Sequence, residues 1–190
     1  MERANSMKSE ASLVIETQRL ILRPPTLEDL PDWVRFAEHE ETMRHLGGVQ
    51  SPSNAWRSLM TMIGAWSAHG YAMFCVIEKS SGTLIGRIGP WQPLDWPGTE
   101  VGWGLHADFW HRGFALEAAA ASIDWVFENL DWPEVIHTIA AENLPSIALA
   151  EKLGSKYHRQ AVLPAPISLE IGVWQQTPGQ WVENRKRLGL

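Results

Sequence analysis

The stretch "ADFWHRGFALEAAAASIDWVFENL", from Ala107 to Leu130, gives the strongest indication of the fold. From about Phe114 onward its apolar residues recur at helical spacing along one face, and acidic residues occupy the opposite face. The apolar face carries Leu116, Ala119, Ala120, Ile123, Val126, Phe127 and Leu130, and the acidic face carries Glu117, Asp124 and Glu128. The pattern predicts an amphipathic helix packed on a sheet.

The start of this helix lacks the Ser, Thr, Asp or Asn that commonly caps a helix N-terminus. The first turn of a helix has free backbone N–H groups and about half a unit of positive charge, so an external anion can complete it. Gly113 allows close backbone approach, Ala115 is small, and Arg112 and His111 add donors. We therefore predict a diphosphate-binding turn at His111–Ala115, with a plain glycine connection as the alternative. Neither P-loop spacing nor G-x-G-x-x-G occurs there.

Strand and helix patterns alternate on both sides of this helix. Alternating or continuous apolar runs predict strands at 19–24, 71–79, 83–91, 99–107, 134–141, 155–163 and 168–176. Helical spacing predicts helices over 32–41, from Ser51 or Ser53 to about Ala68, from about Phe114, and over 146–154, where Gly154 ends the helix. This order predicts one mixed α/β (α+β) domain over residues 16–190, preceded by a polar tail at 1–15.

Composition excludes several classes of protein. The chain has 190 residues and a net charge of −6, which does not favour binding to nucleic acid or to an anionic membrane. No window reaches the roughly 20 apolar residues of a membrane span, and the N-terminus lacks the apolar region of a secretory signal. The single cysteine, Cys75, fits a reducing cytoplasm and lies in an apolar strand, as a core residue would. The seven histidines show no metal-ligand spacing, so no metal site is predicted.

The segment "TEVGWGLH", Thr99 to His106, has an unusual alternation. In a strand, Glu100, Gly102, Gly104 and His106 share one face, and Val101, Trp103 and Leu105 share the other. Two glycines in a row on one face would let a ligand lie against the backbone, or would make room for a packed ring. The chain also has eleven tryptophans, and Trp91, Trp96, Trp103 and Trp110 fall close together. Their large rings predict core packing or, for one or two of them, the wall of a substrate pocket.

Three segments carry a resemblance to a known family. "WHRGFA" (110–115) resembles the acetyl-CoA pyrophosphate loop of the GNAT superfamily of N-acetyltransferases, Q/R-x-x-G-x-G/A, with Trp110 where Gln or Arg is usual and His111 where glycine is frequent. "ETQRLILRP" (16–24), "GWGLHADFWHRGFALEA" (102–118) and "ENLPSIALAEKLG" (142–154) together resemble the RimJ/RimL branch. The similarity covers roughly residues 16–176.

The resemblance implies a fold, a co-substrate and a set of site residues. The fold would be a splayed, mixed and mostly antiparallel sheet flanked by helices, with acetyl-CoA between the two diverging strands. The backbone of Leu105 and the turn residues His111, Arg112, Gly113, Phe114 and Ala115 would hold acetyl-CoA, and Asn143 would bond its arm. Glu100 would act as the general base, through water, and Ser146 as the acid for the leaving thiolate. A local alternative is that Asn143 or Ser146 simply caps a helix.

The expected reaction is direct transfer of acetyl from acetyl-CoA to a primary amine, without an acyl-enzyme. The acceptor would be a protein N-terminus, as for RimJ/RimL-like proteins, or a small-molecule amine. The alternative functions are a non-catalytic acyl-CoA sensor and an interaction protein on the same fold. Oligomeric state is open, and a homodimer is compatible with the sequence.

Overall fold

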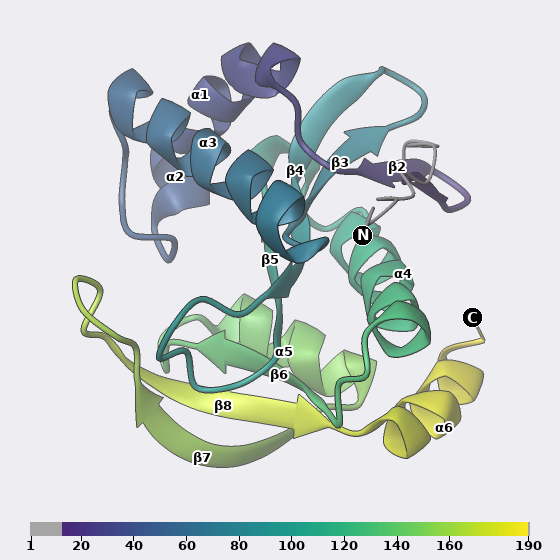
Figure 1. Cartoon of the computed structure of the whole chain (residues 1–190). Coiled ribbons are helices and arrows are strands. Elements are labelled where there is room, and N and C mark those ends of the chain that lie inside the picture. Colours follow the sequence, from purple (N-terminus) through teal and green to yellow (C-terminus); the bar gives the residue numbers. More distant parts are fainter. Residues whose placement is uncertain (1–12, 190) are drawn as a thin grey trace, which may run out of the picture.

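The computed structural model describes residues 13–189, which form one eight-stranded sheet with helices on both faces (Figure 1). The predicted tail lies outside the described residues up to residue 12. Across the sheet the strands run in the order β1 (Ile15–Glu16), β2 (Leu20–Arg23), β3 (Phe74–Glu78), β4 (Thr83–Trp91), β5 (Glu100–Leu105), β6 (Val135–Ile139), β8 (Glu170–Gln176) and β7 (Lys156–Val162). All neighbours are antiparallel except β5 and β6. The predicted mixed, mostly antiparallel sheet is confirmed.

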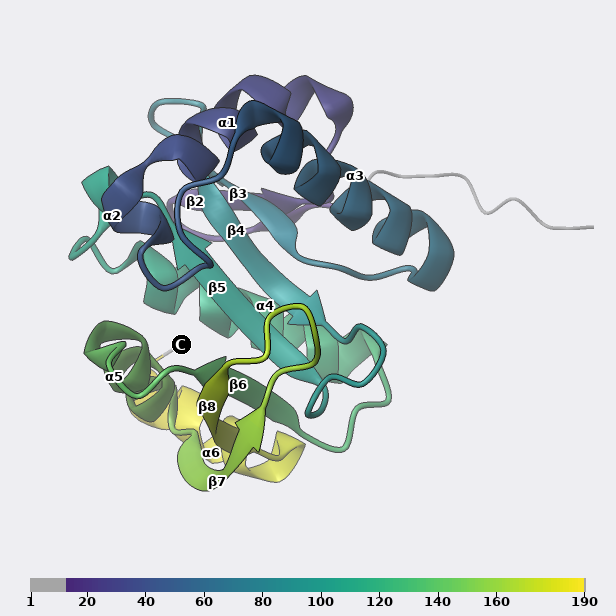
Figure 2. The same ribbon diagram turned by 90° about the vertical axis from the view of Figure 1, so that its left-hand side faces the viewer.

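The helices cover the two faces unequally. α1 (Leu30–Glu38) and α3 (Pro52–His69), with the short α2 (Glu40–Met43), lie in front of β3–β5 in Figure 2, and α4 (Phe114–Asn129) lies behind them. α5 (Leu144–Leu153) packs against β6, and α6 (Pro178–Leu188) packs against α5 (Figure 1). Single 3₁₀ turns precede α1 (Leu27–Asp29) and follow β5 (Ala107–Phe109). Within residues 13–189 no helix combines the length and apolarity needed to cross a membrane.

Two apolar cores follow from this layering. Between α4 and the sheet, the small residues of the helix allow close approach to apolar strand residues, and the fully buried contacts include Ala118, Ala119, Ile123, Leu22, Phe74 and Val101. Between α1, α3 and the opposite face, a second core is built around Trp33, Leu59 and Met62. The central strands are therefore buried on both faces, which explains their continuous apolar runs.

The sheet splays between β5 and β6, as Figure 2 shows. Backbone pairing between them is confined to Glu100 opposite Ile136. Beyond that point the side chain of His137 bridges the strands: Nδ1 donates to the carbonyl of Val101 at 2.7 Å, and Nε2 accepts from the Ser155 hydroxyl at 2.9 Å. A carbonyl only accepts, so the ring is the neutral Nδ1–H tautomer. Burial lowers the pKa of His137 to about 4.

Three features differ from the sequence prediction. The helix predicted over 32–41 breaks at His39, whose backbone is extended and whose Nδ1 accepts from the Thr42 N–H to cap α2. α6 was not predicted, because its one buried residue, Trp181, gives no apolar stripe. Its signal was the capping box that Thr177 and Gln180 form. β1 begins at Ile15, where the sequence suggested only a polar tail.

Candidate functional site

The turn before α4 has the predicted open geometry. Gly113 is the N-cap in the left-handed region, at φ 81° and ψ 0°, and no side chain among residues 13–189 caps the helix. The first helical hydrogen bond runs from the Glu117 N–H to the Gly113 carbonyl at 3.1 Å, so the N–H groups of residues 114–116 precede it. His111 is also left-handed, at φ 60°, which costs a non-glycine residue roughly 1–2 kcal/mol. Residues 111–113 are exposed, so an anion can reach the turn.

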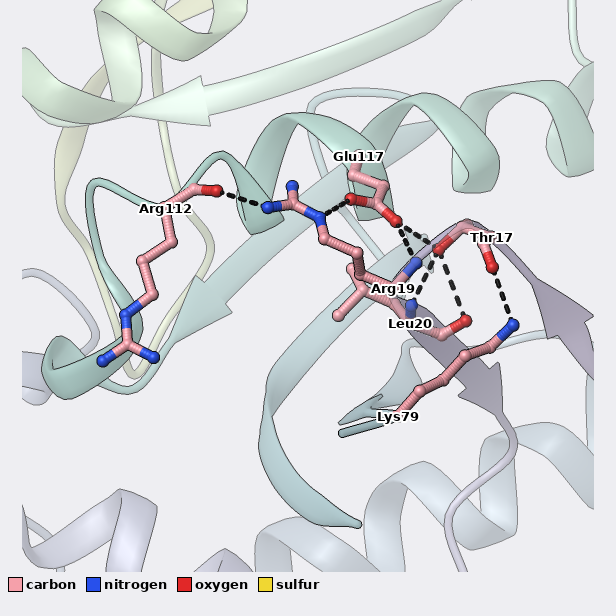
Figure 3. A network of polar contacts seen from close by, with 6 residues as sticks. All are labelled: Thr17, Arg19, Leu20, Lys79, Arg112 and Glu117. Atoms are coloured by element: carbon pink, nitrogen blue, oxygen red, sulfur yellow. Dashed lines mark hydrogen bonds and ion pairs between the residues drawn. The ribbon is translucent and has the colours of Figure 1, made fainter. Parts of the chain in front are cut away.

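Arg19 supports this turn from a distant part of the chain (Figure 3). Its Nη1 donates to the carbonyl of Arg112 at 2.9 Å, and its Nε pairs with Glu117 at 2.7 Å. The guanidinium also lies over the Phe114 ring, 4.6 Å from the ring centre. These contacts fix the peptide that leads into Gly113. The sequence did not predict this role, although Arg19 lies in the first segment of the resemblance.

A second set of bonds holds the supporting hairpin. The Thr17 hydroxyl donates to Glu117 at 2.6 Å, and the Arg19 N–H donates to the same oxygen at 2.8 Å. Lys79 bonds the carbonyl of Thr17 at 2.7 Å (Figure 3). Burial raises the pKa of Glu117, but the bonds donated by Thr17 and Arg19 outweigh it and hold the pKa below its usual value. The hairpin therefore holds the carboxylate of Glu117 in place.

Trp110 replaces the usual Gln or Arg with a structural contact. Its Nε1 donates to the carbonyl of Leu105 at 2.7 Å, which ties the turn back to β5. The carbonyl of Val101 is bonded by His137, so both carbonyls point away from β4. In a strand, the N–H and the carbonyl of one residue point to the same side, and every second residue repeats this direction. The N–H of Leu105 therefore points toward the opening between β5 and β6, like the carbonyls of Val101 and Leu105. This edge of β5 can offer a donor to a ligand in the splay.

The face of β5 predicted to be bare is covered by protein. A side chain placed at Gly102 would meet Met73 at 2.7 Å, and one at Gly104 would meet Leu46 at 2.9 Å and the Phe36 ring at 3.2 Å. The two glycines therefore make room for packed side chains. The expectation of an empty floor is wrong at these two positions.

Glu100 lies at the closed end of the splay. It is 5% exposed, and its Oε1 accepts from the N–H and hydroxyl of Thr138 at 2.9 and 2.8 Å. Its Oε2 accepts from Trp96 Nε1 at 2.5 Å. Burial raises the pKa of Glu100, and these three donors oppose the rise. A carboxylate oxygen has two lone pairs, so Oε2 can accept one more bond than Trp96 supplies.

Ser146 and Asn143 lie across the splay from β5. The Asn143 side chain accepts from the Ser146 N–H at 3.3 Å and caps α5, so the capping alternative holds for Asn143. The Ser146 hydroxyl does not cap the helix. It accepts from Trp103 Nε1 at 3.2 Å, which leaves its own proton available for donation.

Three of the four clustered tryptophans, Trp96, Trp103 and Trp110, share a role that their spacing in the sequence did not reveal. The indole N–H groups of Trp96, Trp103 and Trp110 bond Glu100, Ser146 and the Leu105 carbonyl in turn. Each of these acceptors belongs to a residue that the sequence singled out for the site. The rings orient the site as well as filling space around it.

The structure brings the predicted residues together in two groups. The turn at 111–115 and Leu105 lie at one end of β5, and Glu100 lies at the other end, five residues or roughly 16 Å away along the strand. Ser146 contacts Trp103 between them. The arrangement forms a line along the splayed edge of β5, with the uncapped turn before α4 at one end and the buried carboxylate of Glu100 at the other.

A cluster of three titratable side chains and the single cysteine lie outside this line of residues. The fold brings one ligand atom each of His39, His106 and Asp108 within 4.8 Å of one another, which spacing along the chain could not show. His39 Nδ1 accepts from the Thr42 N–H, so its other nitrogen carries the proton in the neutral ring and is not free to bind a metal. Cys75 is buried, and burial raises the pKa of its thiol, as expected of a core residue.

Comparisons with known proteins show the family to which this fold belongs. The sequence model of a family described as "Acetyltransferase (GNAT) domain" matches residues 19–156. The chain is 30% identical over 141 residues to the uncharacterized N-acetyltransferase p20 of Bacillus licheniformis, which covers 72% of this chain and 79% of that protein.

Solved structures are similar over most of the chain. An acetyltransferase from Agrobacterium tumefaciens superposes with a TM-score of 0.76 at 28% identity, over 86% of this chain and 94% of that one. A putative ribosomal-protein-serine acetyltransferase from Vibrio cholerae superposes with a TM-score of 0.75 at 24% identity, over 87% and 98%, and shows the shared fold. With its splayed sheet and the matching family model, the chain belongs to the GNAT family of acetyltransferases.

Proposed function

We propose that the protein transfers the acetyl group of acetyl-CoA to a primary amine by direct attack within a ternary complex. The observation that carries this is the uncapped first turn of α4, with Gly113 at φ 81°, at the mouth of the splay between β5 and β6. In this assignment the N–H groups of the turn and Arg112 bind the pyrophosphate. The residues present fit such a group, since the turn is exposed and no side chain caps it.

Glu100 is assigned as the base. An α-amine has a pKa near ~8 and a lysine amine near ~10.4, so an ammonium acceptor must lose a proton before it attacks. The free lone pair of Oε2 takes that proton through a water molecule, and the raised pKa of the carboxyl brings it closer to the amine's. The N–C bond then forms as the C–S bond breaks, and the second proton that the attacking nitrogen loses replaces the proton that Ser146 gives to the thiolate. In this proposal the N–H of Leu105 stabilises charge on the acetyl oxygen.

Ser146 is assigned as the acid that protonates the departing thiolate. A thiol pKa near ~8.5 makes the thiolate a fair leaving group, so this donation contributes modestly. Its hydroxyl is oriented by Trp103, which donates to the oxygen. Asn143 bonds the arm of the coenzyme through the part of its amide that does not cap α5.

The acceptor is a protein N-terminus or a small-molecule amine. The resemblance to the RimJ/RimL branch, together with the fold shared with the Vibrio cholerae ribosomal-protein-serine acetyltransferase, supports the first class.

A pair of glycine variants tests the binding turn. Acetyl-CoA at about 100 times its Kd should raise the Tm of the wild type by roughly 5–10 °C. Gly113→Glu places a carboxylate at the anion site and should abolish this shift. Gly70→Glu is the matched control, because Gly70 is also left-handed, at φ 76°, and a side chain there meets nothing within 4 Å. An equal shift in Gly113→Glu and wild type would contradict the assignment of the turn.

Turnover is tested separately, by release of the CoA thiol with a panel of amines and of peptides with free N-termini. Acetylated product and CoA should appear in equal amounts. Binding of acetyl-CoA without thiol release from any acceptor would contradict the proposed reaction.

A further inference from the structure

Arg87 is a cation on the same face of the sheet as Glu100. In the register of β3, β4 and β5, Arg87 lies opposite Cys75 on one side and Gly104 on the other. Paired residues on neighbouring strands point to the same face, so Arg87 shares a face with Gly104 and, four residues along β5, with Glu100. The side chain is half-buried beneath α1 and α3.

No carboxylate of the described residues neutralises Arg87. Its one specific contact there is with the ring of Trp33, whose centre lies 5.6 Å from the guanidinium carbon. Asp29 contacts Cys75, the residue opposite Arg87, but its carboxylate is held by both terminal nitrogens of Arg23 at 2.6 and 2.8 Å. A half-buried guanidinium without an anionic partner is costly, because burial removes much of its hydration.

Arg87 lines a small cavity of about 160 Å³ between α1, α2, α3 and β4. Its other walls are apolar at Trp33, Phe36, Met43, Leu46 and Ala55 and polar at Gln50, Asn54 and Ser58. The amide of Asn54 also reaches this cavity but is engaged with Arg57 and Gln50, at 2.7 and 3.3 Å. The cavity is smaller than the roughly 300–1,000 Å³ that encloses a whole ligand, so it suits one group of a larger molecule.

The cavity is continuous with the packing over β5. Leu46 and Phe36 line it and also cover Gly104, and Met73 covers Gly102 next along the strand. Gly104, opposite Arg87, lies roughly 13 Å along the strand from Glu100. The atoms that cover these glycines belong to the side chains of Leu46, Phe36 and Met73, so a ligand reaching from the cavity toward the splay has to displace side chains and not backbone.

From these observations we infer that Arg87 binds a compact oxyanion, a carboxylate or a phosphate, carried by the acetyl acceptor. The apolar walls contact the body of the acceptor, and its amine extends toward Glu100. This inference deepens the proposed acetyl transfer and rests on it for the identity of the ligand as an acceptor. It makes Arg87 a specificity-determining residue.

The first test is binding, which does not depend on turnover. The wild type, saturated with CoA so that the turn before α4 is occupied, is titrated with inorganic phosphate and with acetate against chloride at constant ionic strength. Both anions should raise the Tm of the wild type and of Arg87→Lys, and should raise it less in Arg87→Gln. Arg44→Gln, which removes an exposed charge at the edge of the same helices, is the matched control and should behave as wild type.

The titration tests anion binding by Arg87 even if CoA does not bind. In that case the titration is repeated with the same variants in the Gly113→Glu background, where the carboxylate of the new side chain occupies the turn before α4. Equal stabilisation of Arg87→Gln and wild type, or no stabilisation of the wild type, would overturn the inference. Failure of CoA itself to shift the Tm would count against the proposed function and not against the anion site.

The second test measures selectivity with paired acceptors. One pair is trialanine and its carboxamide, and the other is 6-aminohexyl phosphate and 6-aminohexanol. The wild type should favour the anionic member of each pair by on the order of tenfold in kcat/KM, and Arg87→Gln should bring that ratio close to one. The two pairs distinguish a carboxylate from a phosphate. A preference that Arg87→Gln leaves unchanged, or no preference in the wild type where both members react, would overturn the inference.

Discussion

The guanidinium of Arg19 donates to the carbonyl of Arg112, 93 residues later in the chain, at 2.9 Å. The bond joins the hairpin of β1 and β2 to the peptide immediately before Gly113. Since the same guanidinium pairs with Glu117 in the first turn of α4, one side chain fixes both sides of the turn (Figure 3).

Arg19→Ala should therefore weaken acetyl-CoA binding without removing the residues that contact it. The ion pair is partly exposed, with side-chain exposures of 43% and 16%, so a loss of about 1 kcal/mol is expected, or roughly five- to tenfold in Kd. Calorimetry measures it. Lys79→Ala is the control, because Lys79 supports the same hairpin but contacts Thr17 and Glu16. An equal loss of affinity in both variants would mean that the hairpin as a whole, and not the Arg19–Arg112 bond, positions the turn.

Glu100→Gln should lower kcat/KM by about 10²–10⁴-fold, the usual contribution of a positioned base. Glutamine keeps the volume and can still accept from Thr138, so the fold should persist. The pH–rate profile gives the sharper measurement, since the acidic limb due to the carboxyl should vanish. Glu142→Gln, at an exposed position, is the control. A mutant profile that overlays the wild type would exclude Glu100 as the base.

Ser146→Ala should lower kcat by roughly tenfold or less, because a thiolate leaves readily even without an acid. Stability should change little, as the hydroxyl caps no helix. Asn143→Ala, by contrast, removes the cap of α5 and should cost about 1 kcal/mol of stability. Steady-state kinetics and thermal unfolding of the two variants measure this contrast. A loss of stability in Ser146→Ala with unchanged kcat would assign the hydroxyl to structure.

His137 should make the protein less stable in acid. Its pKa is about 4 when folded and near 6.5 when unfolded, so the unfolded chain binds the extra proton first. The stabilisation is complete above pH 6.5 and falls by up to about 3 kcal/mol as the pH drops toward 4. Urea unfolding across this range measures it. In His137→Gln this part of the slope should disappear, whereas the exposed His158→Gln should retain it. The raised pKa of Glu100 adds a slope of opposite sign, which is common to all three proteins and cancels in the comparison.

Much of the fold could be predicted because its signals are local. Ser51 and Gly154 mark the ends of two helices, and the alternation of β4 and β5 gives their faces directly. α6 was not predicted because its residues bury little, and its contacts with Asp124 of α4 join residues 57 and 61 positions apart in the sequence. Local patterns do not encode such partners.

In the candidate site, too, local features could be predicted from the sequence and contacts between distant residues could not. The uncapped turn at Gly113 is a local feature and could be read from residue types. The cover over Gly102 and Gly104 could not, because Met73 and Leu46 reach these glycines from other elements. The role of Arg19 depends likewise on an approach across the fold, for which "RLILRP" gave no geometric signal.

The single backbone pair between β5 and β6 also determines which part of the sheet unfolds first. With little ladder to join them, the strands on either side of the splay are connected mainly by side chains, including His137 at the centre and the bonds of Asp124 to Trp181 and Arg185. Amide hydrogens of β6 and β8 should therefore exchange with solvent through partial openings that leave β2–β5 intact. A ligand that contacts both sides of the opening between β5 and β6 should slow amide exchange in β6 and β8, although it is bound at the turn before α4 on the other side.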